Sequence, residues 1–298
     1  MIHFSIYNTA KKLPVEWNAL ATHDIFLQSH YFWALENASP NNISWFYLGI
    51  FNDKKLVGIA VIQRVELYLE DIFRNYKDSC SRQKFKHFIS KFLKGNMLVV
   101  GNLMHTGQHG IYFEANQISK TEFLKSIYKA LDELKEIIKK EHKRRIRIIM
   151  FKDYFTEDSI HLESQFFNSN KLHKISVQPN MVMDVQPHWK NLGDYLFDLN
   201  KKYKQRHKAA QKKAGRIEKK ELSLEDIESN SVRLYELYKT VSDNAKINTF
   251  ILPKGHFCAL KQELNENFKV FAYYLDEVLI GFYTLILNNN ILKLIFGL

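Results

Sequence analysis

Apolar runs along the chain predict strands, and apolar residues at helical spacing predict the helices between them. HFSIY (His3–Tyr7) predicts a strand, and Val15–Leu20 and Ser29–Asn37 predict two short helices. In WFYLGIFNDKKLVGIAVIQRVEL, two β-rich runs flank the polar turn NDKK, which is typical of a hairpin. Residues 68–93 carry apolar side chains at helical spacing and predict one or two helices inserted between strands.

The middle of the chain continues this mixed pattern. MLVVGN (Met97–Asn102) predicts a buried strand, and the glycine-containing loop LMHTGQHG follows it. Ser119 begins a capping box ahead of a long helix, and IRIIMF (Ile146–Phe151) predicts the next strand. Thr156 is expected to cap another helix, and KISVQPNMVMDV (Lys174–Val185) is expected to form a strand pair. This order predicts the α/β class, with a mixed sheet of the α+β kind.

The last third of the chain begins with a basic segment and ends in strands. Leu196–Ile217 predicts one amphipathic helix, with Leu, Tyr, Ala and Ile along one face and lysines around the rest. Ser223 and Asp226 start another helix, and Pro253 stands where a further helix can begin. FKVFAYYLDEVLIGFYTLIL then predicts a second hairpin, and ILKLIFGL predicts a final strand.

The two predicted hairpins match each other. The first reads LGIFNDKKLVGIAVI and the second reads FAYYLDEVLIGFYTL. With an offset of 223 residues, Asp53 meets Asp276 and Gly58 meets Gly281. Unrelated hairpins also look somewhat alike, because Asp favours turns and aliphatic residues favour strands. The long-range match nevertheless favours two copies of one domain.

The repeated hairpin, with a strand, helix and strand after it, resembles the GNAT acyltransferase fold. The pairing of two such units resembles the Fem-like (FemAB/FemX-type) transferases and their acetyltransferase-like relatives. MLVVGN and TGQHG look like the central strand and the donor-side loop of the first unit. The stretch KKYKQRHKAAQKKAGRIE is similar to the Fem-type signature between units, whose places are filled by Lys202, Arg206, Lys208, Ala209 or Ala210, Lys213 and Gly215.

This resemblance covers most of the chain and implies a domain plan and an activity. It implies a first GNAT-like domain at 1–190, a basic connecting helix at 191–222 and a second GNAT-like domain at 223–298. It also implies an N-acyltransferase that moves an acyl or aminoacyl group to an amine, for example on a bacterial cell-envelope or glycan precursor. The donor would be acyl-CoA (acetyl-CoA) or an aminoacyl-tRNA. Because the second unit stops at or inside its central strand, we expect an incomplete second unit and a truncated chain, which need not be active by itself.

Composition limits the class of protein. Hydrophobic residues make up 46% and charged residues 25%, which is normal for a packed soluble protein. The longest apolar run is far shorter than the roughly 20 residues that span a bilayer, and no signal-peptide core is visible at the N-terminus. Cys80 and Cys258 are the only cysteines, which excludes a disulfide framework or a cysteine-built zinc site. These features predict a cytoplasmic protein.

The net charge of +11 is concentrated in one segment. Leu199–Lys220 holds ten Lys or Arg residues and one acidic residue. Lysines of this kind can grip nucleic acid or lie on a membrane surface, but no base-reading motif accompanies them, and Leu196, Leu199 and Tyr203 are only modest apolar anchors. We favour a third interpretation, in which the helix packs on the sheet and its lysines face an anionic ligand. The candidate anion-binding residues are Lys201, Lys204, Arg206, Lys208 and Lys212. The alternative function is a non-enzymatic protein that binds nucleic acid or an anionic surface through this helix.

GNAT-type transfer brings the donor and an amine together and uses a base to take up a proton, without a covalent nucleophile. Glycines let a backbone approach a ligand closely, so the loop after the central strand is a candidate cofactor site. Its candidate residues are Gly101, Asn102, Gly107, Gln108 and Gly110. TGQHG departs from the family's phosphate loop, which reads Arg or Gln, two residues, Gly, one residue, then Gly or Ala. A surface turn before a helix is the alternative.

Two residues are the catalytic candidates. Asp153 follows the strand IRIIMF, and residues at the end of a central strand often face the crevice of an open sheet. It could act as a base or anchor the acceptor amine, and the alternative is a turn or cap residue. His109 lies in the glycine loop. Its four-residue spacing from His105 would suit a metal only on a helix, which the glycines argue against, so no metal is predicted.

Overall fold

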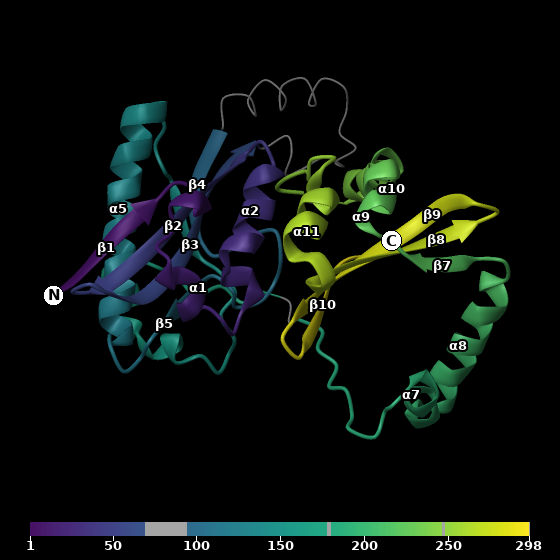
Figure 1. The fold of residues 1–298 in the computed structure, drawn as a ribbon. Coiled ribbons are helices and arrows are strands. Elements are labelled where there is room, and N and C mark those ends of the chain that lie inside the picture. Colours follow the sequence, from purple (N-terminus) through teal and green to yellow (C-terminus); the bar gives the residue numbers. More distant parts are fainter. Residues whose placement is uncertain (69–93, 178–179, 246–247, 298) are drawn as a thin grey trace, which may run out of the picture.

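The computed structural model describes residues 1–68, 94–177, 180–245 and 248–297 (Figure 1). The helices expected between residues 68 and 93 lie outside the described residues. The elements of the first half are β1 (Ile2–Tyr7), η1 (Ala10–Lys12), α1 (Glu16–Leu20), η2 (Ile25–Leu27), α2 (Ser29–Asn37), β2 (Ile43–Asn52), β3 (Lys55–Tyr68), β4 (Lys94–Val100), β5 (Ile111–Phe113), α5 (Lys120–His142), β6 (Ile148–Phe151), η3 (Ser159–Leu162) and α6 (Ser164–Ser169). The elements of the second half are α7 (Leu192–Asp198), α8 (Lys201–Ala214), β7 (Glu218–Glu221), α9 (Leu224–Ser229), α10 (Ser231–Asn244), α11 (His256–Leu264), η4 (Asn265–Asn267), β8 (Phe268–Leu275), β9 (Val278–Asn288) and β10 (Ile291–Gly297).

The strands form two sheets, which confirms the predicted mixed α/β class. The first sheet has the order β1-β2-β3-β4-β6, and β5 pairs with the first part of β3, at residues 58–60. The second sheet has the order β10-β9-β8-β7. In the part of the chain that the structure describes, β4 and β6 are parallel and the other strand pairs are antiparallel. The first sheet and the helix α5 therefore supply the hairpin, central strand, helix and further strand that the resemblance implied.

The two predicted hairpins share one irregularity at the same place. In the first, the register slips between the pairs Ile50–Gly58 and Phe51–Leu56. In the second, it slips at the positions 223 residues further on, between Tyr273–Gly281 and Tyr274–Leu279. Each slip is a β-bulge that leaves one extra residue on the second strand of the hairpin. Because bulges depend on local register, the match supports a repeated unit more strongly than the sequence pattern does.

The repeat extends beyond the hairpins. β1, two helices, β2, β3 and β4 follow one another in the first half, and β7, three helices, β8, β9 and β10 follow one another in the second. β7 takes the place beside β8 that β1 takes beside β2. We call β1 to β6 the first unit and β7 to β10 the second unit.

The two units share one hydrophobic core. α2 packs against α11, and both helices lie between the two sheets (Figure 1). The buried side chains of this core include Trp17 and Phe32 from the first unit, and Phe257 and Phe282 from the second. A second core lies on the other face of the first sheet, where α5 covers β2, β3 and β4. The first sheet is therefore covered on both faces, and one of these cores ties it to the second unit.

Several predicted elements differ from the structure. Lys174–Val185 forms no strand in its described part, and its apolar side chains, such as Met181, are exposed. A β-rich pattern records a preference, which is realised only where a neighbouring strand and a packing face are present. Thr156 caps no helix; Asp158 instead caps η3 by accepting a hydrogen bond from the amide of Ile160.

The basic segment also differs from its prediction. The stretch expected as one connecting helix at 191–222 contains α7, α8 and β7. The chain leaves the helical conformation at Leu199, and Asn200 caps α8 by accepting from the amide of Tyr203 at 3.2 Å. No residue of α8 is buried, so the expected packing on the sheet is wrong. In Figure 1, α7 and α8 stand apart from both sheets. No described helix combines the length and the apolar character that crossing a membrane requires.

Candidate functional site

The candidate site lies at the carboxyl ends of β4 and β6. These neighbouring parallel strands end side by side, with Val100 opposite Phe151. The carboxyl ends of adjacent parallel strands are where open α/β sheets form ligand crevices. Residues 101–110 follow β4 and Lys152 and Asp153 follow β6, so the predicted cofactor loop and the predicted catalytic Asp153 belong to one neighbourhood.

Glycines allow the loop 101–110 to leave and rejoin the sheet at one point. The amide of Gly101 donates to the carbonyl of Val61 at 2.9 Å, and the amide of Val61 donates to the carbonyl of Gly110 at 2.8 Å. The two glycines face each other so closely that a Cβ on Gly110 would lie 2.5 Å from the Cα of Gly101. Gly101 also has a φ of 128°, which side chains rarely tolerate. The loop therefore needs both glycines for its shape.

Two of the predicted cofactor residues are engaged in holding the loop. Asn102 is buried, and its Oδ1 accepts hydrogen bonds from Gln63 Nε2 at 3.0 Å and from the amide of Met104 at 2.9 Å. Gln108 accepts from the amide of Phe155 at 3.1 Å and also hydrogen-bonds Asp158. These contacts tie the loop to β3 and to the segment after β6.

Asp153 also holds the loop 101–110 in place. It adopts the left-handed conformation with a φ of 58°, and its Oδ2 accepts from the amide of Gly107 at 2.9 Å. The same oxygen pairs with Lys152, whose ammonium also donates to the carbonyl of His105 at 2.9 Å. The Asp153 carboxylate is thus joined to the loop backbone and to a lysine.

His109 is paired with an aspartate that the sequence analysis did not single out. Its Nδ1 lies 2.6 Å from Oδ2 of Asp24, which is buried. Since an ionised carboxylate can only accept, Nδ1 carries the proton. Nε2 of His109 has no hydrogen-bond partner among the described residues and is the atom available as a base. The ring lies against Phe26, with 4.5 Å between ring centroids.

A lysine from the second unit completes the cluster. Lys293 of β10 donates to the carbonyl of Thr106, and its ammonium lies 4.8 Å from the ring centroid of Phe26. Burial lowers the pKa of Lys293 to about 8, and the neighbouring Lys152 acts in the same direction, whereas Asp24 opposes it. Such a lysine is still mostly charged at pH 7 but titrates close to neutrality.

His105 lies behind His109 and is neutral. Its pKa is held well below the ordinary histidine value, first by burial and then by the charge of Lys293. Its Nδ1 lies 3.3 Å from the carbonyl of Thr106, and Nε2 is buried without a partner in the described part of the chain. The two histidine rings are 5.4 Å apart, centroid to centroid. Among the residues described, no three His, Cys, Asp or Glu side chains are arranged to hold a metal ion.

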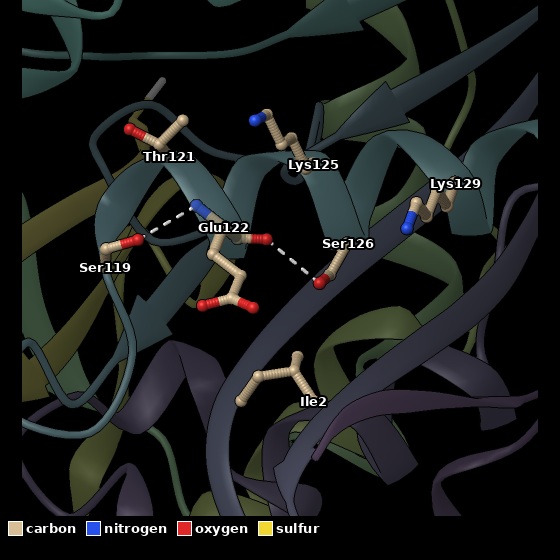
Figure 2. A pocket seen from close by; sticks show the side chains of 7 residues that line it. All are labelled: Ile2, Ser119, Thr121, Glu122, Lys125, Ser126 and Lys129. Carbon is tan, nitrogen blue, oxygen red and sulfur yellow. Dashed lines mark hydrogen bonds between the residues drawn. The ribbon is translucent and has the colours of Figure 1, made fainter.

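The first unit contains a pocket beside the loop and another beside α5. One, of about 210 Å³, adjoins the loop; the residues that line it are Gln108, Ile111, Tyr112, Phe113, Lys120, Phe123, Leu124, Tyr154, Asp158 and Ile160. The other, of about 270 Å³, lies beside the first turns of α5 (Figure 2); it is lined by Ile2, Ser119, Thr121, Glu122, Lys125, Ser126 and Lys129. Only the first contains a predicted site residue, Gln108.

The predicted anion-binding residues lie apart from this cluster. Lys201, Lys204, Arg206, Lys208 and Lys212 all belong to the exposed helix α8. Lys204 donates to the carbonyl of Phe197 at 2.6 Å, and Arg206 lies over the ring of Tyr203. No ion pair joins these five side chains to an acidic residue within the described ranges. The structure therefore brings together the loop, Asp153 and His109, but not the basic helix.

Sequence reasoning missed Asp24, His105 as a neighbour of the base, and Lys293. Asp24 resembles an ordinary cap, because it also accepts from the amide of Phe26 at the start of η2. Lys293 carried a usable signal, since it is a lone charge at an inward position of the apolar strand ILKLIFG. The pairing of these residues with the loop depends on tertiary structure alone.

Comparison with known proteins gives similarities to solved structures and none at the level of sequence. No family model matches the chain, and no curated protein sequence matches it. Among solved structures, the chain is similar to the one described as "Crystal structure of FemX", with a TM-score of 0.46 and 14% sequence identity. The match covers 92% of this chain and 58% of that chain, so this chain spans less than two thirds of the FemX chain.

Proposed function

We propose that this chain is an acyltransferase of GNAT type, built from two GNAT-like units, that transfers an acyl or aminoacyl group to an amine. The first unit would occupy residues 1–190, and the second would begin with β7. The observation that carries the proposal is the pair Asp24–His109, in which a buried carboxylate holds the imidazole and leaves Nε2 free. This pair lies at the carboxyl edge of the parallel strands, where such a transfer would take place.

In the proposed reaction, His109 is the general base. The neutral amine attacks the acyl carbonyl carbon, and a C–N bond forms as the carbonyl oxygen becomes negative. Nε2 of His109 accepts a proton from the attacking nitrogen, and the buried Asp24 stabilises the resulting imidazolium. The C–S bond of an acyl-CoA, or the ester C–O bond of an aminoacyl-tRNA, then breaks, and the leaving group takes up the proton.

Two other groups would support this chemistry. Lys293 places a positive charge beside the histidines, where it can stabilise the negative oxygen or an anionic donor. Asp153 was a candidate base, but its bonds to Gly107 and Lys152 suit an anchor of the loop better. The 210 Å³ pocket beside Gln108 is lined by aromatic rings and would suit the transferred group.

The proposal is tested by direct transfer measurements. Purified protein is incubated with acetyl-CoA or an aminoacyl-tRNA and a panel of amines that includes amino-bearing nucleotide sugars, and products are detected by mass spectrometry. His109→Gln should lower the rate by about 100-fold or more, as loss of a general base does. His142→Gln, at the exposed end of α5, is the matched control. Equal rates for wild type and His109→Gln with an accepted substrate would refute the role of His109.

A binding function is the second candidate, because no residue of α8 is buried. In that case its lysines would neutralise phosphates of a nucleic acid or an anionic surface. Replacing Lys204, Lys208 and Lys212 with glutamine tests this role. The binding role would be supported if the variant binds polynucleotides more weakly than the wild type and if this difference shrinks as the salt concentration rises. Unchanged affinity for every anion would leave α8 as a solvated surface.

A further inference from the structure

The turn between β9 and β10 reaches across to the segment that contains Asp24. Asn288, the last residue of β9, is buried, and its Oδ1 accepts a hydrogen bond from the amide of Ile25 at 2.9 Å. Its Nδ2 donates to Oδ1 of Asp24 at 3.0 Å. The next residue, Asn289, donates from its side chain to the carbonyl of His23 at 2.7 Å. One turn of the second unit therefore contacts three consecutive residues of the first unit.

The Asp24 carboxylate divides its two oxygens between different partners. Oδ1 accepts from Asn288 Nδ2 and from the amide of Phe26, both at 3.0 Å, and Oδ2 accepts from Nδ1 of His109 at 2.6 Å. The terminal torsion of an aspartate is soft, so its carboxylate plane is set by hydrogen bonds rather than by a rotamer. Asn288 supplies the side-chain donor that fixes this plane, and the plane fixes the direction in which Oδ2 meets His109.

We propose that Asn288 is a positioning residue, by which the second unit holds Asp24 so that His109 keeps its proton on Nδ1 and presents Nε2 as the base. This inference rests on the proposed function for its catalytic meaning, but its geometry is independent of the substrate. It gives the second unit a role in the chemistry of the first, because the candidate base is correctly oriented only when the turn between β9 and β10 is docked. Asn288 itself touches none of the reacting atoms.

The tautomer of His109 is the most direct readout. Histidine-selective ¹⁵N labelling and long-range ¹H–¹⁵N spectra distinguish a protonated Nδ1 from a protonated Nε2, and the His109 signals are assigned by their absence in His109→Gln. In the wild type we expect Nδ1–H alone. In Asn288→Ala we expect a mixture of both tautomers, because only the amide of Phe26 then holds Oδ1 of Asp24 and the carboxylate plane is less firmly fixed. Asn267→Ala, exposed on η4 of the same unit and away from the turn, should leave the wild-type tautomer unchanged.

A second variant guards against misfolding. Asn288→Leu keeps nearly the size of the buried side chain but removes the donor to Asp24. It should shift the tautomer as Asn288→Ala does. A His109 that remains fully Nδ1–H in either folded variant would overturn the proposal.

Turnover gives an independent check once a substrate is found. Misplacement of a catalytic group costs up to about 100-fold, so Asn288→Ala should lower kcat by up to that factor with KM little changed. Because the tautomer is read in the protein alone, a shift in Asn288→Ala without any detectable transfer would uphold the positioning role and count against the proposed function. If instead Asn288→Ala keeps the wild-type tautomer and His109→Gln loses transfer, the proposed function would be supported and the positioning role of Asn288 would be refuted.

Discussion

His256 offers a quantitative test of the core that the two units share. It lies on α11 where this helix packs on α2, it is 3% exposed, and its Nδ1 lies 3.3 Å from the carbonyl of Ala38. Burial lowers its pKa to about 4, although the bond to Ala38 acts in the opposite direction. In the unfolded chain the same group titrates at about 6.5. The unfolded chain thus binds the proton more readily, so the free energy of unfolding falls as the pH drops below about 6.5.

The size of this effect follows from the two pKa values. Between pH 7 and pH 5, a group that titrates at about 6.5 unfolded and about 4 folded removes roughly 2 kcal/mol of stability. The variant His256→Asn retains a donor near the carbonyl of Ala38 but does not titrate. Urea unfolding at the two pH values should therefore show that the wild type loses roughly 2 kcal/mol more than His256→Asn. Equal losses in both proteins would show that the imidazole is not held neutral between the units.

Three further predictions follow from close contacts and charge. Gly110→Ala should lower the free energy of unfolding by about 1–3 kcal/mol and weaken donor binding, because its Cβ would lie 2.5 Å from the Cα of Gly101. An unchanged urea midpoint and an unchanged donor affinity would count against the loop geometry. Gly49→Ala, whose Cβ would lie 3.1 Å from the ring of Phe51 and away from the 210 Å³ pocket, should also lower the free energy of unfolding, yet spare binding in a titration with the donor. The charge of Lys293 is lost as the pH rises through about 8, so affinity for an anionic donor should fall about tenfold between pH 7 and 9; calorimetry on Lys293→Met should show no such fall.

Local pattern predicted the repeated hairpin and the long helix well. The turn at Asp53 and the strands beside it depend on residues close together in sequence, and the same is true of Asp276. Ser119 caps α5 as expected, by accepting from the amide of Glu122 at 3.2 Å. Where the interactions are local, sequence spacing was sufficient to predict them.

Elements that depend on distant partners were not predictable. The apolar stretch around Met181 has strand character but no neighbouring strand, so its pattern alone was misleading. Leu196, Leu199 and Tyr203 follow a helical period, although the chain leaves the helical conformation at Leu199 and a new helix is capped by Asn200. A period of apolar residues does not reveal whether a helix has a surface to pack against.

The candidate site illustrates the same limit. The loop and Asp153 are close to their strands in sequence and could be proposed from it, whereas Asp24 lies 85 residues from His109 and Asn288 lies 264 residues from Asp24. No local signal joins residues so far apart. These residues meet because the two units share one hydrophobic core. A single sequence does not show that the units share it.

The location of the donor site is tested most directly by hydrogen–deuterium exchange, with and without acetyl-CoA, an aminoacyl-tRNA or a nucleotide sugar. A bound donor should slow exchange in the loop 101–110, in the segment that follows β6 and in β10, because these elements surround His109. Protection of those three segments is the result that we predict for an acyltransferase site at the end of β4 and β6. Protection confined to α7 and α8, with no change in the loop, would contradict it and favour binding through the basic helix.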